Sequence, residues 1–227
     1  LTDDFWHAAS VFKKMVDECR YESPEAVECL AHSCFNIEHF SFLMQKEKYR
    51  GLGLEAAQKL AVLLPENEKI RLRLLGCKTI ELQWQYLTFH SISQETLLER
   101  LDGIEQDLAA ISLGDPGQNE AFDMSWGVAK TLKINAIQKE EGELKDLIEE
   151  AMHILDQYPR LSSVLTTCIT AVHALHKNVL KDKVSHDETE QLFHYVELNY
   201  DSESARNAFF ALLKDSEDAG RRIDYIT

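Results

Sequence analysis

Apolar residues recur every three or four positions along most of this chain, which is the spacing of one face of an α-helix. Between Glu68 and Phe89 the residues on that face are Leu72, Leu75, Leu82 and Tyr86. Glycine (9 residues) and proline (4 residues) are scarce among the 227 positions. Because all-β and doubly wound α/β folds draw on these two residues for their many tight turns, we predict an all-α fold.

Longer helices of about 20 residues alternate with shorter ones of about 15 residues in this pattern. The expected helices cover residues 5–19, 24–45, 54–64, 68–89, 93–111, 119–139, 143–158, 162–180, 185–199 and 202–214. Asn119 is expected to cap one of them, and Ser185 to Glu188 resembles a capping box. The shorter helices stop about 40–50 residues apart, the range in which a period marks stacked helical hairpins.

Two segments at these stops resemble the end of the second helix of a tetratricopeptide repeat. In Ala61-Val-Leu-Leu-Pro-Glu-Asn67 an alanine and aliphatic residues precede a proline and an asparagine, and Glu150-Ala-Met-His-Ile-Leu-Asp-Gln-Tyr-Pro159 is similar. The resemblance covers most of residues 24–200. The units are longer than the usual ~34 residues, and the Trp-Leu-Gly-Tyr pattern of the first helix has only loose echoes at Trp84/Tyr86 and Trp126/Gly127.

The resemblance implies one domain over residues 1–227, built as a right-handed superhelix of antiparallel helical hairpins, with an irregular helical bundle as the alternative. It also implies a protein–protein interaction scaffold that binds a protein or peptide in a groove and needs no cofactor. In such arrays the first helix of each pair lines the concave surface. The predicted partner-binding stripe there consists of Arg71, Lys78, Glu81, Gln85, Lys130 and Lys133. A solvated helix face explains this stripe equally well.

The net charge and the cysteine pattern limit which partners this protein can bind and in which cellular compartment it functions. The formal net charge of −15 would repel a phosphate backbone, so we expect no direct nucleic-acid binding. No apolar run approaches the ~20 residues that span a bilayer, so we expect no membrane insertion. The five cysteines show no paired spacing, which indicates reduced thiols in a cytoplasmic or nuclear protein.

Apolar residues also mark the two ends of the chain. They are Phe5, Trp6 and Phe12 near the start and Phe209, Phe210 and Leu213 near the end. We expect further repeats, a partner or a second copy of the chain to cover at least one of these faces, so self-association through terminal helices is a prediction. Because the chain begins at Leu1 within helix-like sequence, we also expect a fragment of a longer protein.

No motif for nucleophilic catalysis or phosphate binding occurs, so we predict that the chain is not an enzyme. Glu150 and His153 have the spacing found in di-iron helical bundles, but that chemistry requires a second such motif. Cys29, His32 and Cys34 are residue types that bind zinc, yet Cys34 points away from the helix face that the other two share. The alternatives to a scaffold are therefore a peptide-sensing regulatory domain and, behind it, a helical-bundle metal enzyme.

Two smaller patterns carry simpler expectations. His173 and His176 stand three residues apart with no carboxylate that the sequence names as a partner, so we expect one packed and one exposed side chain. The segment from Gly51 to Leu54 lacks the third glycine and the preceding strand of a dinucleotide-binding loop. We expect it to be a flexible hinge between two helices.

Overall fold

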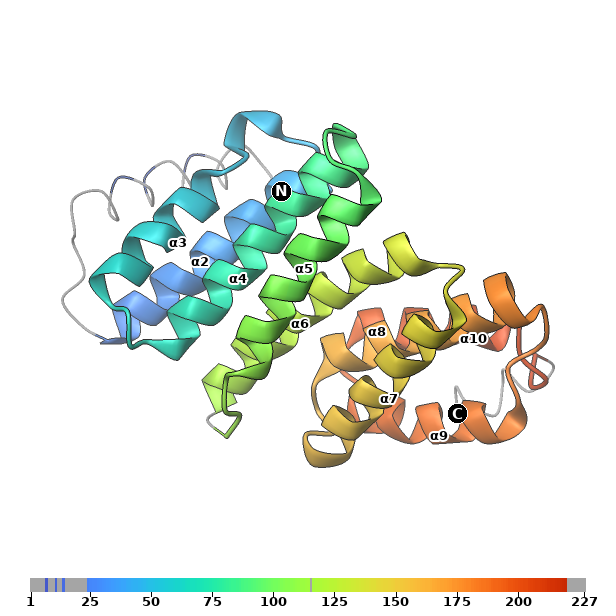
Figure 1. Cartoon of the computed structure of the whole chain (residues 1–227). Coiled ribbons are helices and arrows are strands. Elements are labelled where there is room, and N and C mark those ends of the chain that lie inside the picture. The colour runs from blue at the N-terminus through green and yellow to red at the C-terminus, as the bar shows by residue number, and fades with distance from the viewer. Residues whose placement is uncertain (1–6, 8–10, 12–13, 15–23, 115, 220–227) are drawn as a thin grey trace. The chain divides into compact units, whose positions relative to one another are not determined.

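The computed structural model describes residues 24–114 and 116–219 together with His7, Val11 and Lys14. Within these residues every regular element is a helix, and one isolated parallel bridge joins Val184 to Ser216 (Figure 1). The predicted all-α fold is confirmed. None of the described helices is both long and apolar enough to cross a bilayer. The helix expected over residues 5–19 lies outside the described residues, apart from those three single positions.

Long and short helices alternate along the described chain, as the sequence predicts. The elements are α2 (Pro24–Leu43), η1 (Glu47–Tyr49), α3 (Leu52–Leu63), α4 (Glu68–Gln83), η2 (Trp84–Thr88), α5 (Gln94–Ala109), α6 (Pro116–Ile137), α7 (Glu141–Gln157), α8 (Ser162–Ala174), η3 (Leu175–Leu180), α9 (His186–Leu198) and α10 (Glu203–Leu213). The π-helical turns η2 and η3 continue α4 and α8 without a break. The long members start at residues 24, 68, 116 and 162, so the spacing is 44 to 48 residues.

Side-chain caps fix where several helices begin. Ser93 accepts a hydrogen bond from the third residue of α5, and both halves of the capping box between Ser185 and Glu188 are present at α9. These caps confirm the sequence interpretation. The cap expected at Asn119 is wrong, because α6 already begins at Pro116 and the Asn119 side chain instead accepts a hydrogen bond from the N–H of Gly114 at 3.0 Å.

The described residues fall into two compact units, residues 1–125 and residues 126–227, which we call unit 1 and unit 2. In unit 1, α4 packs against α2, α3 and α5. Arg73 of α4 is buried there, and its guanidinium lies 2.9 Å from Nδ1 of His32 and 3.2 Å from Oε1 of Glu120. In unit 2, α8 packs against α7 and α10. The boundary between the units falls inside α6.

Glycines allow the helices to approach closely at three crossings. A Cβ on Gly76 of α4 would lie 2.6 Å from the Phe35 ring of α2, and a Cβ on Gly127 of α6 would lie 2.6 Å from Cβ of Ser163 in α8. A Cβ on Gly53 of α3 would come within 2.1 Å of a carbonyl oxygen of α2. Each crossing therefore requires a residue without a side chain.

A buried carboxylate holds the start of α3. Glu38 of α2 is fully buried, and its oxygens accept hydrogen bonds from the N–H groups of Gly51 at 2.9 Å, Gly53 at 3.1 Å and Leu54 at 3.3 Å. Burial raises the pKa of Glu38, and these N–H donors offset part of that effect. The segment expected to be a hinge is therefore the capped first turn of a helix, with Gly51 in the left-handed region at φ 78°.

Large aromatic residues pack inside the units. Trp84 and Trp126 have 0% and 2% of their surface exposed, so both belong to the core. Phe209 and Leu213 are each 1% exposed within unit 2. The apolar residues expected to be exposed at the C-terminal end are thus largely covered by the chain itself, and self-association through the terminal helices stays a prediction.

Candidate functional site

Two residues of the predicted stripe belong to a chain of polar contacts, which we call the polar ladder (Arg50, Glu81, Gln85 and Arg100). Arg50 Nε donates to Glu81 Oε2 at 2.9 Å, and its Nη2 donates to the other oxygen. Gln85 donates to Glu81 at 2.8 Å and accepts from Arg100 at 3.0 Å. Burial alone would raise the pKa of Glu81, but the bonds from Arg50 and Gln85 hold it below the usual value. The ladder therefore joins the loop before α3 to α4, η2 and α5.

The other stripe residues lie in different surroundings. Arg71 and Lys78 are exposed on α4. Lys130 has a 5% exposed side chain, and its ammonium pairs with Glu150 at 2.7 Å. Lys133 is 14% exposed and lies 3.7 Å from a glutamate of α7. A partner could therefore reach Arg71 and Lys78 directly, whereas contact with Lys130 would require its ion pair to open.

One end of unit 1 exposes a group of apolar side chains that the sequence did not single out. We call this group the Phe89 surface, and it consists of Leu43 (58% exposed), Met44 (36%), Leu87 (38%) and Phe89 (37%). Figure 1 shows the C-terminal ends of α2 and α4 at the same end of this unit. Buried Trp84 joins the two helices there, because its ring lies 5.4 Å from the Phe42 ring and 5.6 Å from the Phe89 ring.

Arg50 ties this surface to the polar ladder. Its guanidinium carbon lies 4.7 Å from the centroid of the Phe89 ring, a cation–π distance, while the same group holds Glu81. The Phe89 ring therefore lies between buried Trp84 and the Arg50 guanidinium and contacts both. Arg50 has little freedom to move, because both of these contacts position it.

The π-helical turns are a second feature that only the structure reveals. Each is followed by a residue in the left-handed region, His90 at φ 49° after η2 and Lys181 at φ 61° after η3. Each connection then ends at a serine cap, Ser93 or Ser185. π-Helical turns are rare and often occur at functional sites. The two units thus share one kind of helix connection despite unrelated residues.

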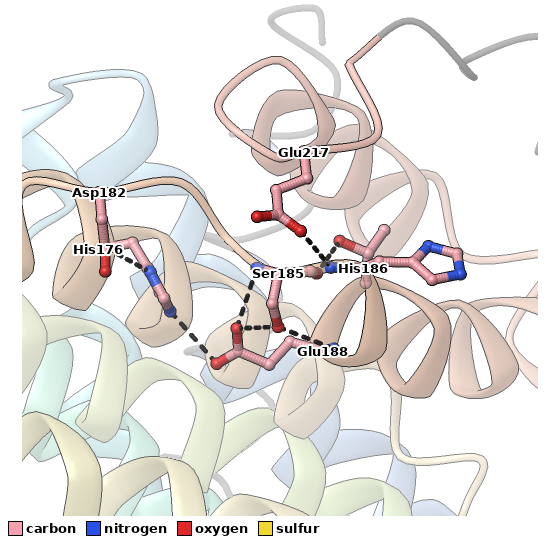
Figure 2. Close-up of polar contacts among 7 residues, drawn as sticks. His176, Asp182, Ser185, His186, Glu188 and Glu217 are labelled. Carbon is pink, nitrogen blue, oxygen red and sulfur yellow. Dashed lines mark hydrogen bonds and ion pairs between the residues drawn. The ribbon is translucent and has the colours of Figure 1, made fainter.

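In unit 2 this connection carries a polar cluster around His176 (Figure 2). His176 is 7% exposed, and its imidazole lies between two carboxylates, with Nδ1 2.7 Å from Asp182 Oδ1 and Nε2 3.2 Å from Glu188 Oε1. Ser185 donates to Glu188 through its N–H at 3.0 Å and its hydroxyl at 2.6 Å. Burial would raise the pKa of Glu188, but these bonds and the contact with His176 bring it below the usual value.

The His176 cluster is arranged to hold helices together. Both ring nitrogens of His176 face carboxylate oxygens, so neither faces a hydroxyl or thiol that the ring would activate. The Ser185 hydroxyl donates to Glu188 and makes no contact with the imidazole, unlike a serine that a histidine activates. The expectation of one packed and one exposed histidine holds only in part. His176 is packed, and His173 is partly covered and bonds Asp215 at 2.7 Å.

The side chains considered for metal binding diverge. Glu150 accepts hydrogen bonds from Trp126 and Lys130, whereas His153 contacts Gln157 at 2.9 Å. In the second candidate set, which comprises Cys29, His32 and Cys34, the Cys29 side chain is exposed and the Cys34 side chain is buried. Across the part of the chain that the structure describes, no three histidine, cysteine, aspartate or glutamate side chains are placed to hold a metal ion.

The buried cysteines behave as apolar residues. Burial raises the pKa of Cys34 and Cys168 to about 12, and it raises the pKa of Cys77 well above its usual value. Their thiols therefore stay protonated at neutral pH, and the thiol form is a poor nucleophile and metal ligand.

Comparison of the chain with protein-family models, with curated proteins and with solved structures found no match. The resemblance to tetratricopeptide repeats stays a prediction from sequence, and the functional argument depends on the residues themselves.

Proposed function

We propose that this chain is a protein-binding scaffold of stacked helical hairpins similar to tetratricopeptide repeats, and that a partner docks on unit 1. The observation that carries the proposal is the Phe89 surface, where Leu43, Met44, Leu87 and Phe89 stay exposed at one end of a packed unit. Contiguous exposed apolar side chains beside polar ones are typical of protein interaction sites.

The polar ladder supports this proposal because it makes the surface rigid. Arg50 is held by Glu81 and by the Phe89 ring, so the partner would meet a pre-formed set of groups. Rigid groups lose less conformational entropy on binding than mobile ones do. Arginine and aromatic side chains also supply a large share of binding energy at protein interfaces.

The regular spacing of the long helices supports the repeat interpretation. Their starts lie 44 to 48 residues apart, and the closely packed crossings at Gly76 and Gly127 join successive long helices. Stacked hairpins of this kind bury one another's apolar faces and form an extended concave surface that can bind a partner.

The test is affinity capture with this chain as bait, comparing two double variants with the unchanged protein. Leu43→Ser with Leu87→Ser removes apolar area from the Phe89 surface. The matched control is Val62→Ser with Leu63→Ser, since these residues are 81% and 49% exposed at the far end of α3 in the same unit. We expect a reproducible protein partner that the first variant loses and the second retains.

A further bait distinguishes the Phe89 surface from the predicted stripe. Arg71→Glu with Lys78→Glu reverses the two exposed stripe charges without disturbing a buried pair. Loss of the partner from this bait alone would place the interface on α4 instead. Baits that are folded by circular dichroism and capture nothing reproducible would contradict the scaffold proposal.

A further inference from the structure

The loop beside the Phe89 surface is basic although the chain as a whole is acidic. Lys46, Lys48 and Arg50 are exposed there, and Glu47 is the one acidic residue among positions 46–50. The formal net charge of the chain is −15. A partner with negative charge would therefore be repelled by most of this protein and attracted to this end, which favours one docking place.

The chemistry of the surface also limits the form of the partner. The elements at this end are the last turns of α2 and α4, η1 and η2, so a partner strand would find no sheet edge to pair with there. A helix satisfies its own backbone hydrogen bonds and needs only side-chain contacts from its binding site. An amphipathic helix meets the exposed aliphatic and aromatic groups with one face and the lysines with its flanks.

We propose that the Phe89 surface binds an acidic amphipathic helix of a partner protein, whose apolar face covers Leu43, Met44, Leu87 and Phe89 and whose carboxylates meet Lys46, Lys48 and Arg50. This inference rests on the proposed scaffold function and names the chemistry of its partner. Arg50 keeps donors for such a carboxylate, because Glu81 occupies Nε and Nη2 while Nη1 bonds to no described residue.

A buried donor beneath the surface fits the same picture. The Trp84 indole is fully buried, and its Nε1 has no acceptor among the described residues. Buried N–H groups nearly always have an acceptor in folded proteins. Phe89 stacks on this ring and is itself 37% exposed, so a partner that covers Phe89 would change the surroundings of Trp84. Binding should then change the fluorescence of Trp84.

The experiment selects helical peptides from a displayed library against the whole chain. Each peptide has about 18 residues, roughly five helical turns, with leucines fixed on one face and glutamate, lysine or glutamine randomised on the other. We expect enrichment of peptides rich in glutamate. Enrichment of lysine-rich or neutral peptides, or no enrichment, would overturn the proposal.

Charge reversal locates the binding site of a selected peptide. Lys46→Glu with Lys48→Glu should weaken binding on the order of tenfold at low salt, with a smaller effect at high salt. The matched control is Lys181→Glu with Lys183→Glu, an exposed pair in unit 2 that also flanks one acidic residue. Equal effects of the two reversals, or no effect of the first, would contradict the assignment.

The outcomes separate this inference from the scaffold proposal. If capture yields a partner that depends on Leu43 and Leu87 but the library yields no acidic peptides, the scaffold function stands and the partner chemistry is wrong. If neither experiment succeeds, both proposals fail. If the chain self-associates in sedimentation and Lys46→Glu with Lys48→Glu abolishes this, the surface binds a second copy, and the proposed partner is wrong.

Discussion

Replacement of Gly53 by alanine tests whether the close crossing of α2 and α3 is required for stability. The added Cβ would lie 2.1 Å from the carbonyl oxygen of Cys34 and 3.0 Å from Cβ of Glu38. Weak contacts between carbon and a carbonyl oxygen settle at about 3.3–3.6 Å, so the added Cβ and this oxygen would have to separate by about 1.2–1.5 Å. The carbonyl is backbone and cannot rotate away as a side chain would.

The expected loss follows from two opposing effects. Overpacking of this kind costs about 1–3 kcal/mol, and more where backbone atoms collide. Alanine regains at most about 0.5–1 kcal/mol of helix propensity over glycine. The separation would also stretch the bonds from Gly53 and Leu54 to the buried Glu38 carboxylate. We therefore expect a net loss of about 2–3 kcal/mol, which lowers the melting temperature of a unit of this size by roughly 8–12 °C.

Thermal and urea unfolding followed by circular dichroism measure this change. Gly142 is the matched control, because it is the second residue of α7 as Gly53 is the second residue of α3, and a Cβ added to it would meet nothing within 4 Å. Gly142→Ala should leave stability unchanged or raise it slightly. A Gly53→Ala protein as stable as the Gly142→Ala protein would refute the reasoning.

Three further predictions concern buried groups. Because the folded protein has a raised pKa at Glu38, the protonated carboxyl stabilises the fold fully below pH 4.5, and this stabilisation is lost as pH rises through the raised pKa. The free energy of unfolding of Glu38→Gln, measured by urea unfolding, should therefore rise relative to that of the unchanged protein as pH increases from 4.5. An absorbance titration should find a tyrosine with a pKa of about 12, raised by burial and by Asp156, and Tyr195→Phe should remove it and cost about 0.5–1.5 kcal/mol. Under native conditions a thiol reagent should label exposed Cys29 but leave Cys168 unlabelled until the chain unfolds, as peptide mapping would show.

Local patterns in the sequence predicted much of the helical architecture. The spacing of apolar residues predicted the long stretches 68–89 and 162–180, which the structure confirms as α4 with η2 and α8 with η3. The capping box at Ser185 was predictable because its partners lie within three residues of each other. The cap at Asn119 was wrong because Pro116 already begins the helix, and proline is well suited to a first helical position.

The candidate site was predicted only in part. The predicted stripe included Glu81 of α4 and Gln85 of η2. Nothing in the sequence paired Glu81 with Arg50, 31 residues away, or Gln85 with Arg100, 15 residues away. Lys130 was assigned to a solvent-facing groove, and the structure buries it against α7. The π-helical turns gave no sequence signal, because one extra residue per turn barely alters a pattern of threes and fours.

The sequence alone determined that this chain forms helices, where most of them begin and end, and how long and short ones alternate. Those properties depend on backbone geometry and on caps that act over three or four residues. The tertiary structure decided which helix faces are covered and that the Phe89 surface remains exposed. It also decided that Glu38 of α2 caps the N-terminus of α3. These outcomes depend on contacts between residues far apart in the chain, and the periodicity of one helix does not indicate which neighbour will cover it.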